Sequence, residues 1–165
     1  MKIGLISDTH SYLDDKVFSY FDKCDEVWHA GDIGSIDVAD KLSDFKPFKA
    51  VYGNIDGHDI RNQYPEHLQF ECAGSKVWIT HIGGYPPKYT PAMKKLLAEH
   101  TPDLFICGHS HILKVMSDPK MNNLLHMNPG AAGKHGFHKI RTLLRFEINE
   151  GKIGQVQAIE LGKRA

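Results

Sequence analysis

The sequence predicts an α/β fold in which two mixed β-sheets carry helices on their outer sides. In the first half of the chain, short apolar runs alternate with amphipathic stretches, which is the pattern of strands joined by crossover helices. In the second half, most apolar runs are short and follow one another closely, which favours further strands. With 165 residues, 41% of them hydrophobic, the chain can bury one core, so we expect a single domain spanning residues 1–165.

The first half contains three predicted strands with a helix in each gap between them. The strands are short buried runs at residues 3–7, 26–30 and 49–52. Apolar residues recur at helical spacing in both gaps, in the first at Leu13, Val17, Phe18 and Phe21 and in the second at Ile36, Val38, Ala39 and Leu42. Strands separated by helices pair in parallel, so we expect their carboxyl ends at one edge of a sheet.

The middle of the chain predicts a β-hairpin followed by a loop and a helix. Residues 68–73 and 76–80 flank Gly74-Ser75 and are expected to pair across a tight turn. Residues 83–87 are expected to form a loop. Thr90 then caps a helix that has Pro91 in its first turn and an apolar side made of Met93, Leu96 and Leu97.

The remaining chain is mostly strand in this prediction. Apolar segments that favour strands occur at residues 104–107, 113–116, 123–127, 142–148 and 152–161. The last two are joined at Glu150-Gly151. Residues 130–138 are rich in Gly, Ala, His and Lys, and we expect them to form a surface loop near a site.

Charge and cysteine content exclude several classes of function. Lys plus Arg and Asp plus Glu each total 20, so no global field favours nucleic acid or an anionic membrane. No apolar stretch reaches the roughly 18 residues of a membrane span. The three cysteines form no CxxC pair and indicate neither a disulfide framework nor a thiolate metal site. We therefore expect a cytoplasmic protein without a membrane or nucleic-acid partner, and homo-oligomerisation stays open.

Side chains that can bind metal follow almost every predicted strand. They are Asp8, His10, Asp32, Asn54, His81, His109 and His111. Taken singly, Asp8 and His10 could cap the following helix and Asp32 could belong to a turn. Because the carboxyl ends of parallel strands face one crevice, however, we expect these side chains to converge.

The chemistry of this set favours two metal ions. Carboxylate, imidazole and amide ligands without thiolate suit Mn, Fe, Co, Ni or Zn rather than a closed structural zinc site. The set is too large for one ion, and it suits two ions about 3.5 to 4 Å apart that share a bridging carboxylate, the arrangement used for in-line displacement at phosphorus. The sequence therefore predicts a two-metal hydrolytic site.

Five short motifs carry a resemblance to a known family. They are Asp8-Thr9-His10, Gly31-Asp32, Gly53-Asn54-Ile55-Asp56, His81 and Gly108-His109-Ser110-His111. In this order they resemble the calcineurin-like metallophosphoesterases, in particular the small, cap-free phosphodiesterases of bacteria and archaea. The resemblance extends from Lys2 to about Gly130.

The resemblance implies a fold and a set of roles. The fold would be a four-layer αββα sandwich of two sheets flanked by helices. One ion would bind Asp8, His10, Asp32 and His111, and the other would bind Asp32, Asn54, His81 and His109. Asp32 would bridge the two ions, and Asp32, Asn54 and His109 would also serve catalysis. Manganese is the expected ion, with Fe, Ni, Co or Zn as alternatives.

The same resemblance implies hydrolysis of a small phosphorylated substrate, expected to be a phosphodiester, by a hydroxide that bridges the two ions. Two dications, two aspartates and one hydroxide sum to a single positive charge, which matches a diester monoanion. Larger phosphatases of the superfamily carry a histidine after the Gly-Asn pair, thought to protonate the leaving group. Ile55 occupies that position here and cannot donate a proton.

Two other functions stay open at this point. A subunit of the retromer complex has this fold and acts as a protein-interaction scaffold, although it departs from the ligand pattern. A phosphomonoesterase of the same superfamily is the second alternative. Among neighbouring residues, Asp56 is expected to orient Asn54 or His81, His58 to lie in a surface loop, and His29 and His126 to be packed in strands. Lys134, His135 and His138 are candidates for contact with a substrate phosphate.

Overall fold

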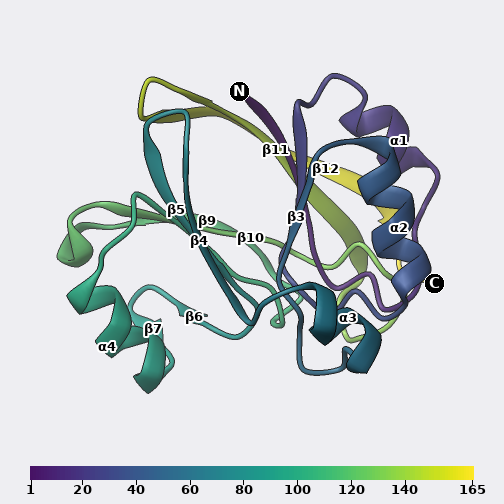
Figure 1. Ribbon diagram of the computed structural model, residues 1–165, viewed down its shortest axis with the longest axis horizontal. Coiled ribbons are helices and arrows are strands. Elements are labelled where there is room, and N and C mark those ends of the chain that lie inside the picture. The colour runs from purple at the N-terminus through teal and green to yellow at the C-terminus, as the bar shows by residue number, and fades with distance from the viewer.

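A computed structural model describes residues 1–165, and its first sheet is built from both ends of the chain (Figure 1). The strand order is β12-β11-β1-β2-β3. Strands β1, β2 and β3 are parallel, whereas β11 runs antiparallel to β1 and β12 antiparallel to β11. The bounds are β1 (Lys2–Ile6), β2 (Glu26–His29), β3 (Phe48–Ala50), β11 (Ile140–Asn149) and β12 (Lys152–Lys163).

The second sheet comes from the middle of the chain and has the order β4-β5-β8-β10-β9. Strands β5, β8 and β10 are parallel, and the antiparallel strands β4 and β9 lie at the two edges. The bounds are β4 (His67–Cys72), β5 (Ser75–Thr80), β8 (Leu104–Ile106), β9 (Leu113–Asp118) and β10 (Leu124–Pro129). Both sheets are therefore mixed, as predicted.

Helices lie outside the two sheets and complete four layers (Figure 1). Helices α1 and α2 cover the outer face of the first sheet, and α4 covers the second, beside a small hairpin of β6 and β7. The bounds are α1 (Lys16–Phe21), α2 (Ile36–Phe45), α3 (His58–Gln63), α4 (Pro91–Glu99), β6 (Gly84–Tyr85) and β7 (Lys88–Tyr89), with a 3₁₀ turn at Pro119–Met121. The predicted four-layer fold is confirmed.

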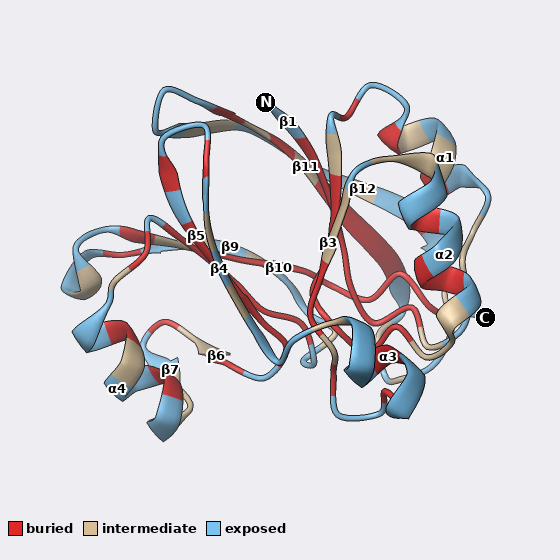
Figure 2. Cartoon of the chain, viewed as in Figure 1, coloured by how far each residue is buried: buried red, intermediate tan, exposed pale blue.

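Alternation along the strands produces three apolar layers. Ile3 and Leu5 of β1 point into the core between the sheets, whereas Ile6 packs under α1 and α2. The central layer also contains Trp28 from the first sheet and Ile79 from the second. The buried colour in Figure 2 accordingly follows the strands and the inner sides of the helices, while the outer sides of the helices are exposed.

Local sequence explains where α4 begins. The Thr90 side chain accepts a hydrogen bond from the Met93 amide, and Pro91 occupies the first turn of α4, where its missing N–H costs nothing. Met93 and Leu97 are buried by packing against the second sheet. The predicted cap of α4 is therefore confirmed.

Four local predictions were wrong or incomplete. The hairpin turn is Ala73-Gly74, both at positive φ, and Ser75 already pairs with Cys72. The expected loop at residues 83–87 contributes to the β6–β7 hairpin. His58 begins α3 instead of lying in a loop, because Ile60 is buried and anchors this short helix. The segment 130–133 is buried, since the Gly133 and Ala132 amides donate to the carbonyls of Asp8 and Ser7.

Candidate metal centre

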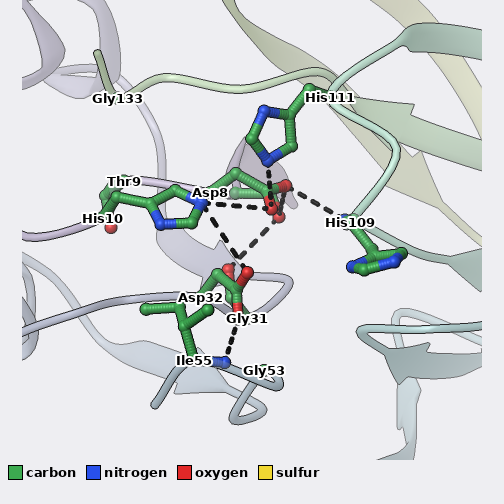
Figure 3. A network of polar contacts seen from close by, with 12 residues as sticks. Asp8, Thr9, His10, Gly31, Asp32, Gly53, Ile55, His109, His111 and Gly133 are labelled. Atoms are coloured by element: carbon green, nitrogen blue, oxygen red, sulfur yellow. Dashed lines mark hydrogen bonds and ion pairs between the residues drawn. The ribbon is translucent and has the colours of Figure 1, made fainter. Parts of the chain in front are cut away.

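The side chains predicted to bind metal come together where strand ends of both sheets meet. Asp8 and His10 follow β1, Asp32 follows β2 and Asn54 follows β3, whereas His81 follows β5 and His109 and His111 follow β8. Ligand atoms fall into two groups, each within 4.8 Å: Asp8 with His10 and His111, and Asp32 with His81 and His109. Figure 3 shows Asp8, His10, Asp32 and His111 pointing toward one centre.

Five of these residues have a strained backbone. Asp8, His10, Asp32, His109 and His111 adopt φ values of 52°, 46°, 54°, 65° and 57°. The left-handed region costs a residue with a side chain about 1 to 3 kcal/mol, and such strain concentrates at functional sites. Backbone hydrogen bonds maintain the strained conformation here, because the Asp8 amide donates to the Gly31 carbonyl and the His10 amide donates to the Asp32 carbonyl. The fold thus fixes the directions of these side chains.

Only one of the two carboxylate oxygens of Asp8 is hydrogen-bonded to the protein. Its Oδ2 accepts hydrogen bonds from Ser7 Oγ at 2.6 Å and from the His109 amide at 3.2 Å. Its Oδ1 is buried and has no hydrogen-bond partner. Oδ1 faces the Nε2 atoms of His111, His81 and His10 at 3.2, 3.9 and 4.0 Å. One oxygen is therefore held in place and the other is left free.

Asp32 belongs to the second group and also lies close to His10 of the first. Its Oδ1 accepts from the Ile55 amide at 3.0 Å (Figure 3), and its Oδ2 lies 3.2 Å from His81 Nε2 and 3.6 Å from His10 Nε2. Burial opposes ionisation of Asp32, but the hydrogen bond and charge of His81 outweigh it and lower the pKa of Asp32. Asp32 is therefore a carboxylate with one free oxygen between two imidazoles.

Hydrogen bonds at Nδ1 fix the tautomers of two imidazoles, those of His81 and His111. His81 Nδ1 donates to the Ala30 carbonyl at 2.8 Å, which leaves Nε2 without a proton when the ring is neutral. His138 Nε2 donates to the Gly133 carbonyl at 2.9 Å, so His138 Nδ1 accepts from His111 Nδ1 at 3.2 Å. In their neutral forms, which metal binding requires, His81 and His111 therefore each present a lone pair on Nε2 to the centre.

The donor set fits divalent cations. His81 Nε2 faces Asn54 Oδ1 at 3.1 Å and Asp32 Oδ2 at 3.2 Å, which places three atoms with lone pairs together. Asp8 Oδ1 and His10 Nε2 are buried without a partner, a costly state for polar atoms unless a ligand occupies the centre. Burial lowers the pKa of His10 in spite of the nearby carboxylates, which keeps that ring neutral. Oxygen and nitrogen donors of this kind suit transition metals.

Sequence comparison agrees with this geometry. The profile of the calcineurin-like phosphoesterase superfamily domain matches residues 1–151. The chain belongs to this superfamily. A probable metallophosphoesterase of Methanothermobacter thermautotrophicus is 32% identical over 136 residues, which cover 79% of this chain and 77% of that protein. A phosphodiesterase of Methanocaldococcus jannaschii is 31% identical over 146 residues, covering 79% and 83%.

Solved structures with the same fold include an enzyme and a sorting protein. A novel archaeal phosphodiesterase superposes with a TM-score of 0.77 at 25% identity, covering 98% of this chain and all of its own. Vps29 of Entamoeba histolytica, solved in complex with zinc, gives a TM-score of 0.75 at 16% identity with 100% of both chains covered. Membership of a metallophosphoesterase family implies divalent metal ions. No helix in the structure has the length and apolar character needed to cross a membrane.

Asp56 supports the centre through backbone atoms. Its carboxylate accepts from the amides of Ile33, Gly34 and Gly53, at 3.1, 2.7 and 2.8 Å. It therefore joins the loops that carry Asp32 and Asn54, rather than orienting the Asn54 or His81 side chain as expected. A Cβ at Gly53 would collide with Asp32 Oδ1, so only glycine lets these two loops approach.

His29 and His126 are packed inside strands, as predicted. The Thr9 hydroxyl donates to the Ile33 carbonyl, so His29 Nε2 donates to Thr9 Oγ1 at 3.0 Å while His29 Nδ1 accepts from the Gly31 amide. Burial lowers the pKa of His29 to about 4 and keeps it neutral behind the ligand loops. Sequence reasoning missed Ser7 as a partner of Asp8, although its position beside the first motif was a signal.

The centre opens onto a cavity of about 450 Å³. His135 lines it with its ring centroid 5.0 Å from that of His10, and His138 lines it as well. Lys134 does not line it, because its Nζ lies over the Tyr12 ring at 4.5 Å. His58 is also outside the cavity and contacts Asn62. Among the loop residues considered, only the two histidines can face a substrate there.

Proposed function

We propose that this protein is a phosphodiesterase that uses two divalent metal ions. One observation carries the proposal: Asp32 presents a free carboxylate oxygen between two groups of ligand-type side chains, and both face an open cavity. Two metals bridged by a carboxylate are the arrangement that supports in-line displacement at phosphorus. Family membership and the relatives named as phosphodiesterases support the reaction class.

The proposed ligand sets follow the two groups. Asp8, His10, Asp32 and His111 would hold one ion, and Asp32, Asn54, His81 and His109 the other. The ions would supply Lewis acidity toward a phosphoryl oxygen and toward the attacking water. Manganese is our proposed ion, and iron, nickel, cobalt and zinc have suitable ligand preferences too. The zinc seen in the Vps29 structure supports binding of a transition metal by this fold.

The remaining chemistry belongs to the chain itself. Two dications, the buried Asp8 and Asp32 carboxylates and one attacking hydroxide would sum to a single positive charge, so a singly charged diester is better matched than a doubly charged monoester. Asn54 and His109 stand at the cavity surface, where they can contact a bound phosphate. Ile55 lies beside them and cannot supply a proton to the leaving group. The site is therefore suited to diesters whose leaving group departs as a stable anion.

The cellular setting is also a proposal. All three cysteines are free and buried, which suits a reducing compartment, and we propose the cytoplasm. One apolar core joins both sheets, so we propose that residues 1–165 form a single domain.

Metal dependence tests the function directly. Protein stripped with a chelator should not hydrolyse bis(para-nitrophenyl) phosphate, and reloading with Mn²⁺ should restore hydrolysis together with up to two ions per chain by elemental analysis. His58→Ala, outside the cavity, serves as a control that should keep full activity. Failure to take up any metal after incubation with Mn²⁺ would favour a scaffold function of the Vps29 kind instead.

A further inference from the structure

Phe137 is a fully exposed aromatic residue on the wall of the candidate metal cavity. Its exposed fraction is 103%, the highest among the large hydrophobic residues of the chain. Ile112 and Ile55 line the same cavity and are 59% and 46% exposed. Scattered exposed apolar residues are normal, but a group of them inside one cavity indicates a binding surface.

The loop that carries Phe137 is held in place on both sides. Gly136, at φ 124°, packs so closely on His111 that a Cβ would overlap the His111 ring. On the other side, Arg164 donates to the His138 carbonyl at 3.0 Å and the His138 ring is bonded to Gly133. The ring of Phe137 is therefore presented to solvent by a fixed backbone.

No Lys or Arg lines this cavity. Lys134 stacks on Tyr12, and Arg61 donates its guanidinium protons to the carbonyls of Gly53, Asn54 and Asp56. A polyanion such as a nucleic acid or a polyphosphate would need cationic side chains for its additional charges. The cavity instead offers apolar surface next to a centre where the proposed ions would supply all the positive charge.

We propose that Phe137, together with Ile112 and Ile55, binds an apolar or aromatic ester substituent of the phosphodiester and thereby determines substrate specificity. This inference rests on the proposed function and names its substrate class: an isolated diester with at least one apolar arm. An aromatic arm can stack on Phe137, and an aromatic contact of this kind contributes about a tenfold change in affinity.

Two diesters with the same leaving group test the proposal. Para-nitrophenyl phenyl phosphate and methyl para-nitrophenyl phosphate differ only in the arm that stays on phosphorus. We expect the metal-loaded protein to prefer the phenyl diester, and Phe137→Ala to lower kcat/KM for it by about tenfold while changing the methyl diester less than about twofold. Phe137→Tyr should restore the preference. Val156→Ala, an exposed apolar residue on β12, is the matched control.

An equal loss for both diesters in Phe137→Ala, or no loss for either, overturns the proposal and leaves this surface to a protein partner. Because Phe137 packs against nothing, its truncation should leave the fold intact, which thermal unfolding can verify.

If neither diester is hydrolysed by the unmodified protein, the proposed function fails. The inference about Phe137 is then tested by measuring the affinities of diesters by calorimetry. Diphenyl phosphate binding about tenfold tighter than dimethyl phosphate, with the difference lost in Phe137→Ala, supports it; equal affinities overturn it.

Discussion

His138 Nδ1 lies 3.2 Å from His111 Nδ1 and accepts a hydrogen bond from it, because His138 Nε2 donates to the Gly133 carbonyl. Losing such an outer partner typically weakens metal binding about 10- to 100-fold. His138→Ala should therefore weaken binding of the ion assigned to Asp8, His10 and His111 by this amount in a metal titration. His138→Asn, whose amide oxygen can accept the same hydrogen bond from His111, should recover part of the loss. Unchanged metal affinity in His138→Ala would contradict a role of His138 in orienting His111.

Asp32→Asn tests the bridge. Asn keeps the shape of Asp32 and can still accept from the Ile55 amide, so we expect the variant to fold normally. Loss of the charge shared by both groups should reduce hydrolysis of an activated aryl diester by about 10²- to 10³-fold, close to background. Asp8→Asn, which affects one group, should cost less. If Asp32→Asn keeps most activity while Asp8→Asn does not, the bridging carboxylate has been misassigned.

Ile55 predicts how the rate depends on the leaving group. General acid catalysis is typically worth about 10² to 10⁴ in rate, and Ile55 offers none. The unmodified protein should therefore show a steep decrease in kcat/KM as the leaving-group pKa rises. Ile55→His should raise the turnover of poor leaving groups more than that of good ones, because the half-exposed side chain has room to change at the cavity wall.

Ile55→Leu is the control and should retain the steep dependence. Of the two loop histidines at the cavity, His135 is the alternative donor, because both ring nitrogens of His138 are already hydrogen-bonded and His58 lies outside the cavity. A flat dependence in the unmodified protein that persists in His135→Ala would refute this explanation of Ile55.

His126 predicts a pH dependence of stability. Burial, reinforced by Lys114, lowers the pKa of His126 to about 4, whereas an unfolded histidine titrates near 6.5. Between these values the unfolded chain binds more protons, so the free energy of unfolding should fall as the pH falls from about 6.5 to about 4, by about 3 kcal/mol from this residue. Above pH 6.5 its contribution should be constant.

His126→Leu should remove its share of this loss, measured by urea unfolding of the metal-free protein, while His29, whose pKa burial also lowers to about 4, keeps its own share. The Nδ1 atom of His126 has no hydrogen-bond partner, so the substitution breaks no hydrogen bond there. If His126→Leu loses as much stability between pH 6.5 and 4 as the unmodified protein does, His126 makes no contribution and the prediction is wrong.

The strands and candidate ligands were predictable because both follow from short-range pattern. An apolar run such as that before Asp8 marks a strand, and in parallel strands the next polar residues lie at one edge. The turn at Ala73-Gly74 was missed because alanine at φ 46° carries no sequence signal. Helix α3 was missed because only Ile60 is buried in it, too little for a helical pattern.

The supporting contacts were not predictable, because they depend on chain segments far apart. Asp56 contacts the amides of Ile33 and Gly34 only after β2 and β3 pair. His138 reaches His111 only after β11 has joined the first sheet and segment 130–133 has been buried. Composition suggested a surface loop for segment 130–133, but tertiary packing buries it.

The candidate ligands are divided between the two sheets: Asp8, His10, Asp32 and Asn54 follow strands of the first, and His81, His109 and His111 follow strands of the second. Neither sheet alone carries a full set of the proposed ligands, so complete coordination would require the two sheets to be docked. Ions bound in this way would link the two sheets, and by mass action their binding would raise the free energy needed to separate the sheets. A substitution deep in the shared core, such as at Ile79, can therefore loosen ion binding without touching any ligand.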